Sequence, residues 1–243
     1  MGVSFSFLKF FDIVYKQNAF NDSVIALGSL NINESDDSIR EFASKNQWWK
    51  QDDTNSIRSL FRDRYHILNY RDIDINGRAD IWLDLNKPID SSYRNSANVV
   101  LNGGTLEHVF DIAQSLKNIH GMLREGGTVI HLLPISWYNH GFYNFNPLLF
   151  KEISAANNYQ LLAEGFYCNP NALTCVVQGM PVNHDNQDEP ATTFITFDGE
   201  YTEENERISN SFNKVVFPSN LLYMVAYKKN NSDEFVYPVD CQS

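Results

Sequence analysis

The segment that most constrains the fold spans residues 98–134 and alternates strand and helix signals. It begins with an apolar run at 99–101 and a Gly-Gly pair, and a second Gly-Gly pair precedes another apolar run. Strands without polar alternation are typical of a parallel sheet that is covered on both faces. Between the glycine pairs, apolar residues recur at the spacing of one helix face, namely Val109, Ile112, Ala113, Leu116, Ile119 and Leu123. The segment therefore predicts a strand–helix–strand unit of an α/β fold.

The end of the first of these strands is the expected position of a ligand site. In open α/β sheets, ligands bind outside the carboxyl ends of the strands. Here that end carries small, polar and titratable side chains, which makes it the first place to look for chemistry: Asn102, Gly103, Gly104, Thr105, Glu107 and His108.

The charge of the chain disfavours a nucleic-acid partner. Its 30 acidic and 19 basic residues give a formal net charge of −11 over 243 residues. Binding to a phosphate backbone depends on clustered Lys and Arg. The cluster of Arg58, Arg62 and Arg64 is expected to form a solvated helix face instead.

Cysteine and histidine usage indicates a reduced protein without a metal. Cys168, Cys175 and Cys241 fit neither a disulfide framework nor a zinc spacing. The six histidines lack ligand spacing along the chain, so the sequence predicts no metal site.

The first 20 residues have neither the pattern of a secretion signal nor the length and apolarity of a membrane span. We expect a cytoplasmic protein with no membrane partner.

Two motifs of the 98–134 segment resemble class I S-adenosylmethionine-dependent methyltransferases. They are TLEHV at residues 105–109 and LREGG at residues 123–127, and the resemblance extends over roughly residues 23–159. It implies a Rossmann-like three-layer α/β/α sandwich with a mainly parallel, seven-stranded sheet and an antiparallel last strand. It also implies S-adenosylmethionine as the cofactor and methyl transfer to a small-molecule acceptor.

The first strand of this fold is expected at residues 23–27 and ends at Gly28. A residue without Cβ lets the backbone approach a ligand and turn sharply. The resemblance places Gly28 and Ser29 beside the cofactor, although the family's usual G-x-G-x-G is absent. The missing glycines oppose a nicotinamide-dependent reductase, which needs the fuller fingerprint.

Acidic residues follow the next two predicted strands. In the resembling family, a carboxylate at the tip of the second strand accepts hydrogen bonds from both ribose hydroxyls. Asp72 and Asp74 are the candidates, and the spacing does not choose between them. Asp84 matches the position that accepts from the adenine amine, with the Leu85 backbone amide available to the ring. Turn formation is the alternative role for each aspartate.

The resemblance also places Asn102, Gly103 and Glu107 near the methyl donor. The dipole of the expected helix stabilises a carboxylate near its N-terminus, so a purely structural role of Glu107 is an alternative. His108 is a candidate general base, because an imidazole titrates near neutrality, or it only shapes the pocket.

A loop rich in aromatic residues and amides follows the fifth strand at residues 136–147 and contains an HGFYNF-P pattern, which also occurs in part of the methyltransferase superfamily. Loops on a rigid scaffold commonly carry the groups that select a substrate. His140, Tyr143 and Asn144 are the acceptor-side candidates, with His140 and Tyr143 as catalytic candidates beside His108. The alternative is an aromatic plug over the sheet.

The chain is predicted to form one domain over residues 1–243. Its expected parts are helices at 4–18, 35–64 and 147–157, strands at 65–70 and 79–86, a core at 22–168, an insertion at about 180–218 and a last strand at 220–229. The first helix is expected to pack on the sheet edge or on a second subunit of a homo-oligomer. Trp48 and Trp49 are expected either to cover the core or to lie at the edge of the cofactor or substrate cleft.

The sequence thus predicts a methyltransferase. A catalytically silent binding or assembly protein on the same fold is the alternative, motivated by the sparse glycine loop.

Overall fold

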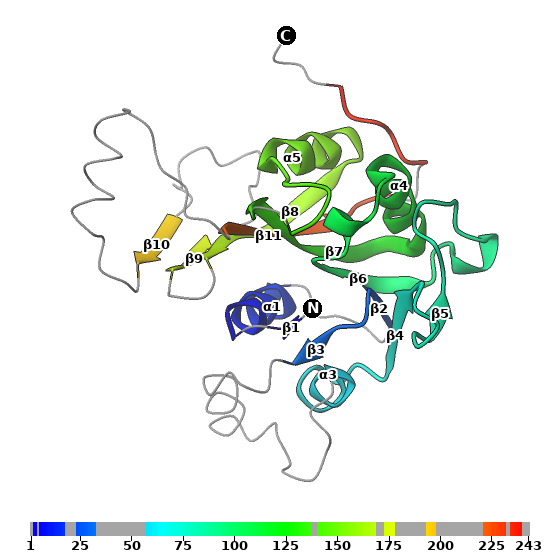
Figure 1. Ribbon diagram of the computed structural model, residues 1–243, viewed down its shortest axis with the longest axis horizontal. Helices are drawn as coiled ribbons and strands as arrows, with labels where there is room; N and C mark the ends of the chain where they lie inside the picture. The colour runs from blue at the N-terminus through cyan, green and yellow to red at the C-terminus, as the bar shows by residue number, and fades with distance from the viewer. Residues whose placement is uncertain are drawn as a thin grey trace.

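The structure is a computed structural model that describes residues 2–3, 5–17, 23–32, 57–137, 140–168, 173–177, 193–197, 221–231 and 234–239. Helices lie on both faces of one large sheet (Figure 1). Helices α1 (Phe5–Gln17) and α3 (Ile57–Tyr65) lie on one face, and α4 (Ile112–Met122) and α5 (Pro147–Ala156) lie on the other. The predicted three-layer sandwich is confirmed.

The sheet runs in the order β10-β9-β8-β11-β7-β6-β2-β4-β5. From β7 to β5 all neighbours are parallel, and β11 is antiparallel to both β7 and β8. The mainly parallel sheet with an antiparallel last strand is therefore confirmed. The strands are β2 (Ser23–Leu27), β4 (Asn69–Asp74), β5 (Ile81–Trp82), β6 (Ala97–Gly103), β7 (Leu123–Ser136), β8 (Tyr159–Cys168), β9 (Leu173–Val177), β10 (Thr193–Phe197) and β11 (Leu221–Lys229).

Within the described residues the sheet has nine strands, two more than the seven that were predicted. Strands β9 and β10 pair antiparallel to each other and continue the sheet from β8. Strand β10 falls inside the range predicted as an insertion. Two short strands, β1 (Gly2–Val3) and β3 (Asn31–Ile32), pair parallel to each other and form a separate two-stranded sheet.

The central strands are buried on both faces, as their apolar runs indicate. Ile25 and Leu27 of β2 and Val99, Val100 and Leu101 of β6 are all fully buried. Burial of each such side chain stabilises the fold by roughly 1.5–3 kcal/mol. Because these strands are held from both sides, their carboxyl ends form a fixed platform for a site.

Helix α4 is shorter than the apolar spacing predicted. It begins at Ile112, because the Asp111 side chain caps it by accepting a hydrogen bond of 2.9 Å from the Gln114 amide. Val109 ends a preceding 3₁₀ turn, and Leu123 begins β7. Ala113, predicted on the buried face, is exposed. The buried face consists of Ser115, Leu116, Asn118, Ile119, His120 and Met122.

The strand predicted at residues 65–70 is wrong in its position. Tyr65 ends α3, His66 takes a left-handed backbone with φ of 55°, and the Ile67 amide donates to the Phe61 carbonyl. Strand β4 begins only at Asn69. The strand predicted at residues 79–86 is likewise reduced to Ile81–Trp82.

The first helix is confirmed, but it packs on a face of the sheet and not on its edge. Helix α1 lies against β8, β9 and β11, and it buries Phe7, Phe10, Phe11 and Val14. The predicted helix at 147–157 is also confirmed, since Asn146 caps α5 with Pro147 at its start. Trp48, Trp49 and the first part of the helix predicted at 35–64 lie outside the described residues.

Candidate functional site

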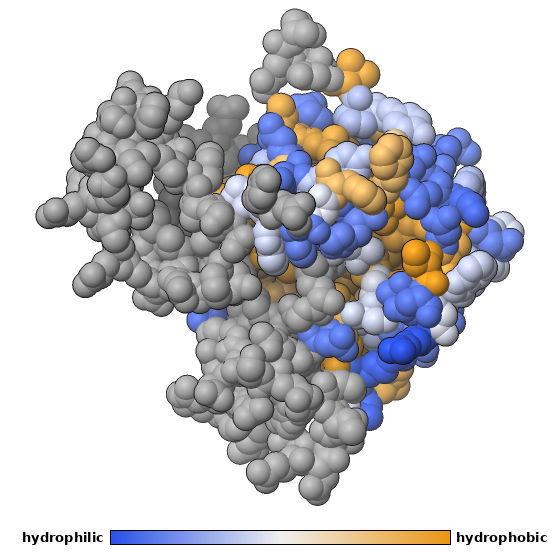
Figure 2. Space-filling view, viewed as in Figure 1, coloured by the Kyte–Doolittle hydropathy of each residue, from blue (hydrophilic) through white to orange (hydrophobic). Residues whose placement is uncertain are grey.

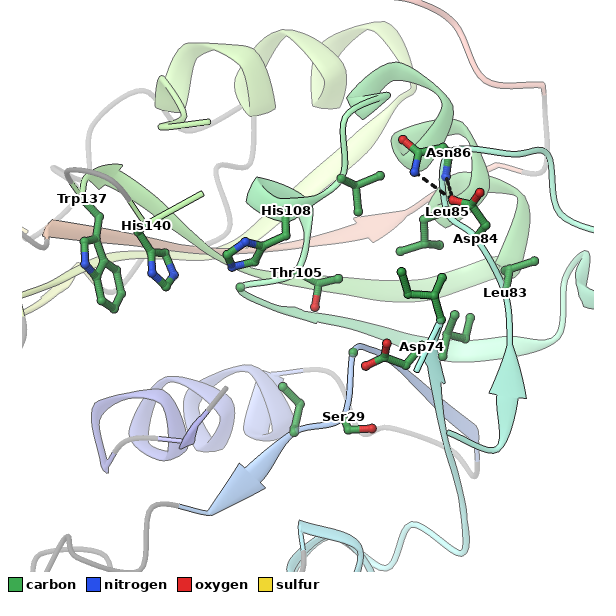
Figure 3. Close-up of a pocket in the computed structure, with 16 residues that line it drawn as sticks. Ser29, Asp74, Leu83, Asp84, Leu85, Asn86, Thr105, His108, Trp137 and His140 are labelled. Atoms are coloured by element: carbon green, nitrogen blue, oxygen red, sulfur yellow. Dashed lines mark hydrogen bonds between the residues drawn. The ribbon is translucent and has the colours of Figure 1, made fainter. Parts of the chain in front are cut away.

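A cleft of about 630 Å³ opens at the carboxyl ends of β2, β4 and β6 (Figure 3). This volume lies in the range of small-molecule sites, roughly 300–1,000 Å³. The cleft brings together nine residues that the sequence singled out, from segments far apart in the chain: Gly28, Ser29, Asp74, Asp84, Leu85, Gly104, Thr105, His108 and His140.

Gly28 forms the turn at the end of β2. Its φ is +75°, and its amide donates a hydrogen bond of 2.7 Å to the Ile73 carbonyl. A Cβ at this position would lie 2.6 Å from the Thr105 hydroxyl oxygen, which in turn donates to the Leu27 carbonyl. Only glycine satisfies both the backbone conformation and the close approach.

The structure distinguishes the two aspartates of β4. Asp74 lines the cleft and lies near Ser29 in Figure 3. Asp72 does not line the cleft, and its carboxylate already has hydrogen-bond partners. It accepts hydrogen bonds from Arg58 (3.2 Å), the Asp80 amide (2.9 Å) and the Ser29 hydroxyl (3.2 Å).

Asp84 and Asn86 form a tight turn at the far end of the cleft in Figure 3. The Asp84 carboxylate accepts bonds from the Asn86 side chain (2.8 Å) and the Asn86 amide (3.0 Å), which lower the pKa of Asp84. The Asn86 side chain in turn accepts from the Asp111 amide at the start of α4. The turn thus holds Asp84 as a charged acceptor and Leu85 at fixed positions along the wall.

Besides Asp72, three further residues predicted beside the cofactor do not line the cleft. The buried Asn102 side chain accepts bonds from the Thr105 and Leu106 amides, so it shapes the turn after β6. Gly103 packs against Leu30, where a Cβ would lie 2.6 Å from a Leu30 methyl. Glu107 is buried behind the wall at 1 % exposure.

Trp137, His140 and His108 lie in a row on one side of the cleft (Figure 3). The Trp137 and His140 rings are stacked with centroids 3.7 Å apart, and His108 meets His140 edge-on at 5.0 Å. Burial, together with the neighbouring His108, lowers the pKa of His140, which favours a neutral imidazole. A neutral imidazole can accept a proton.

Glu107 lies directly behind this row of rings. Its Oε1 is 3.7 Å from Nε2 of His140, beyond hydrogen-bond distance. Burial raises the pKa of Glu107 to about 7. A buried carboxyl group thus faces two imidazoles.

The loop residues Tyr143 and Asn144 fasten the loop and do not line the cleft. The Tyr143 hydroxyl donates a bond of 2.8 Å to the Phe110 carbonyl, and the Asn144 side chain accepts from the Trp137 amide. Because Tyr143 does not line the cleft, the position of its side chain does not support the catalytic role predicted for it.

The sequence did not point to seven of the lining residues, most of them apolar: Leu30, Ile73, Ile75, Leu83, Asn86, Val109 and Trp137. Most are neighbours of predicted residues, so their positions at strand ends were the signal that could have found them. Trp137 begins the aromatic loop and was recognisable on that ground.

Comparison with known proteins gives similarity in structure and none in sequence. No protein-family model matches the chain, and no curated protein matches it. A SAM-dependent methyltransferase from Archaeoglobus fulgidus is similar in structure over 91% of this chain and 91% of its own, at 12% identity and a TM-score of 0.43.

Two further solved structures are similar over most of the chain. One is the complex of the Haloferax volcanii Trm112 methyltransferase activator with a methyltransferase, at 12% identity and a TM-score of 0.44, covering 90% of this chain and 88% of that one. The other, described as a methyltransferase of Bacillus halodurans, is 8% identical with a TM-score of 0.46, covering 90% and 97%.

The strand order of the sheet itself decides the fold. The sequence resemblance implied a mainly parallel sheet with an antiparallel last strand and helices on both faces. The structure has five adjacent parallel strands, and its last strand, β11, is antiparallel and lies between β7 and β8. The chain therefore has the Rossmann-like fold of the class I S-adenosylmethionine-dependent methyltransferases.

Proposed function

We propose that this protein transfers a methyl group from S-adenosylmethionine to a small-molecule acceptor. The observation that carries the proposal is the convergence of Gly28, Asp74 and Asp84 on one cleft at the carboxyl ends of the strands. The sequence resemblance placed Gly28 beside the cofactor, Asp74 or Asp72 at the ribose and Asp84 at the adenine amine. Gly28, Asp74 and Asp84 line the same cleft.

The residues of the cleft fit the cofactor at three places. Asp74 offers an acceptor-only carboxylate to the ribose diol, while the carboxylate of Asp72 is already occupied. Asp84 and Leu85 stand where the adenine ring would lie. The glycine turn at Gly28 leaves the backbone open to the methionine part of the ligand.

The cofactor supplies an electrophilic methyl group when it is bound. The protein then has to hold the acceptor in line with the methyl group and exclude water. We assign this task to the side of the cleft formed by Trp137, His140 and His108. His108 and His140 are the candidates to take a proton from the acceptor.

Several expectations about partners and location belong to the same proposal. We propose a cytoplasmic, single-domain protein without a nucleic-acid partner. The three arginines of α3 support the last point, since each guanidinium lies near a carboxylate: Arg58 with Asp72 and Asp80, Arg62 with Asp63, and Arg64 with Asp12. Within the described ranges, none of the helices has the length and apolarity needed to cross a membrane. A homo-oligomer stays a prediction.

Calorimetric titration with S-adenosylmethionine and S-adenosylhomocysteine tests the proposal. We expect binding near the micromolar range, about −8 kcal/mol, with one ligand per chain. Absence of binding to both compounds would overturn it. Binding without methyl transfer to any of a broad set of hydroxyl, amine and carbon acceptors would favour the silent binding protein.

A further inference from the structure

We propose that Glu107, His108 and His140 bind a divalent transition-metal ion at the acceptor side of the cleft. Each of the three offers one ligand atom, and these atoms all lie within 4.8 Å of one another. Glu107 and His108 are adjacent in the turn after β6, and His140 comes from the loop after β7. The sequence-based prediction of no metal site considered spacing along the chain, and the fold supplies a cluster that this spacing does not show.

The buried carboxylate points independently to a ligand. Glu107 is 1 % exposed, and within the described part of the chain its Oε2 has no hydrogen-bond partner. Nε2 of His140 is also buried without such a partner there. A buried polar atom without a partner costs about 1–3 kcal/mol, so an unpartnered atom on each of two neighbouring side chains requires an explanation. A cation between the Glu107 carboxylate and the His140 imidazole would give both side chains a partner.

The distances suit an ion. Oε1 of Glu107 and Nε2 of His140 are 3.7 Å apart, too far for a hydrogen bond. Two atoms each about 2.1 Å from a tetrahedral zinc ion lie roughly 3.4 Å apart. His108 is exposed, so rotation of its side chain can close the remaining distance.

The backbone around the cluster holds Glu107 and the His140 loop together. The Phe142 amide donates a bond of 2.7 Å to the Glu107 carbonyl. Gly141 packs so closely that a Cβ there would lie 2.7 Å from the same carbonyl oxygen. The Trp137 ring stacks on His140 and fixes the plane of its imidazole.

The donor set defines the class of ion. Two imidazoles and one carboxylate suit Zn²⁺, Fe²⁺ and related first-row ions, whereas Mg²⁺ and Ca²⁺ prefer oxygen ligands. Because His108 and His140 line the cleft, the coordination positions left open would face it. If the proposed function holds, on which this step rests, the acceptor is a compound with an oxygen or nitrogen donor that can occupy such a position.

Cobalt binding tests the site directly. Chelator-treated protein is titrated with Co²⁺, and the visible absorption of the bound ion is followed before displacement by Zn²⁺. We expect one equivalent of Co²⁺ and its full displacement by Zn²⁺. Glu107→Gln and His108→Ala should each weaken Co²⁺ binding at least tenfold. His66→Asn is the matched control, because it removes an exposed imidazole outside the cluster and Asn tolerates the left-handed backbone there.

The outcomes separate this proposal from the proposed function. S-adenosylhomocysteine binding is measured on the same samples, and thermal unfolding checks that each variant is folded. Binding of S-adenosylhomocysteine without cobalt absorption would overturn the metal site alone. Cobalt absorption without binding of S-adenosylhomocysteine would overturn the proposed function alone. Equal loss of cobalt binding in His66→Asn and His108→Ala would show an adventitious surface ion and overturn the metal site. If Glu107→Gln fails to fold, the cobalt binding of His108→Ala decides, because His108 is exposed.

Discussion

The hydroxyl of Thr105 occupies the space that a side chain at Gly28 would need, with its oxygen 2.6 Å from the position of a Cβ. The same hydroxyl donates to the Leu27 carbonyl, so it cannot move away without losing a hydrogen bond. This contact joins the ends of β2 and β6, the two strands that border the centre of the cleft. The glycine is therefore required by its neighbour as well as by its own backbone.

We predict that Gly28→Ala loses both stability and ligand binding. A left-handed alanine costs about 1–2 kcal/mol, and the clash with Thr105 adds about 1–3 kcal/mol. Displacement of the turn should lower the affinity for S-adenosylhomocysteine at least tenfold. Denaturant unfolding and calorimetry measure the two effects.

Gly77→Ala provides the matched control. Gly77 has nearly the same φ of +72°, but a Cβ there would meet no atom within 4 Å. It should therefore lose only the backbone contribution and keep the ligand affinity. Equal losses of stability in the two variants would show that the Thr105 contact has no cost.

We predict that Asp74→Asn and Asp72→Asn act on different properties. Asp74→Asn should weaken S-adenosylhomocysteine binding about 10–100-fold, because a hydrogen bond to a charged group contributes roughly 1.5–3 kcal/mol. Its stability should change little, since an asparagine oxygen can still accept from the Asn76 amide. Asp72→Asn should cost about 1 kcal/mol of stability by weakening the contacts to Arg58 and Asp80. The reverse pattern in calorimetry and unfolding would assign the ribose role to Asp72.

A third prediction concerns the contact between α1 and α3. The Tyr65 hydroxyl donates a bond of 2.6 Å to the buried Asp12, and burial raises the pKa of this phenol well above its usual range. Tyr65→Phe leaves a carboxylate oxygen without that donor, so we expect a loss of about 1–3 kcal/mol in the free energy of unfolding. Tyr237→Phe, at an exposed tyrosine, is the control and should change stability by less than about 0.5 kcal/mol. Similar values for both variants would contradict a stabilising role for the buried bond.

The sequence predicted those parts of the fold that depend on local pattern. Uninterrupted apolar runs identified β2 and β6, and Asn146 with Pro147 marked the start of α5. The start of α4 was misplaced because Val109 and Leu123 continue the apolar spacing of the helix while belonging to the turn and the strand beside it. Periodicity alone cannot show where a capping residue such as Asp111 interrupts the helix.

The lining of the cleft was predicted in part for a similar reason. Positions at strand ends identified Gly28 and Asp84, because a parallel sheet brings such ends together. The proposed choice of Asp74 over Asp72 rests on the position of Arg58, which approaches Asp72 from another element. The cluster of Glu107 with His140 depends on how the loop after β7 folds back, and no local pattern encodes that contact.

The last prediction is a pH dependence that arises from His131. This histidine is 3 % exposed, its Nδ1 lies 3.3 Å from Nδ2 of Asn102, and burial lowers its pKa to about 3. The unfolded chain binds a proton at His131 below about pH 6.5, and the folded protein does not. The stability due to the neutral histidine is therefore complete above that pH and is lost as the pH falls toward 3, by about 1.4 kcal/mol per unit.

His131→Asn isolates this contribution, because asparagine can keep a partner for Asn102 but does not titrate. Between pH 7 and pH 5, the free energy of unfolding of the natural protein should fall by about 2 kcal/mol more than that of the variant. Carboxyl groups titrate in both proteins, so their effect cancels in the difference. Urea unfolding at the two pH values gives the result. Parallel pH profiles would mean that His131 binds a proton in the folded protein as readily as in the unfolded chain, and burial would then not hold it neutral.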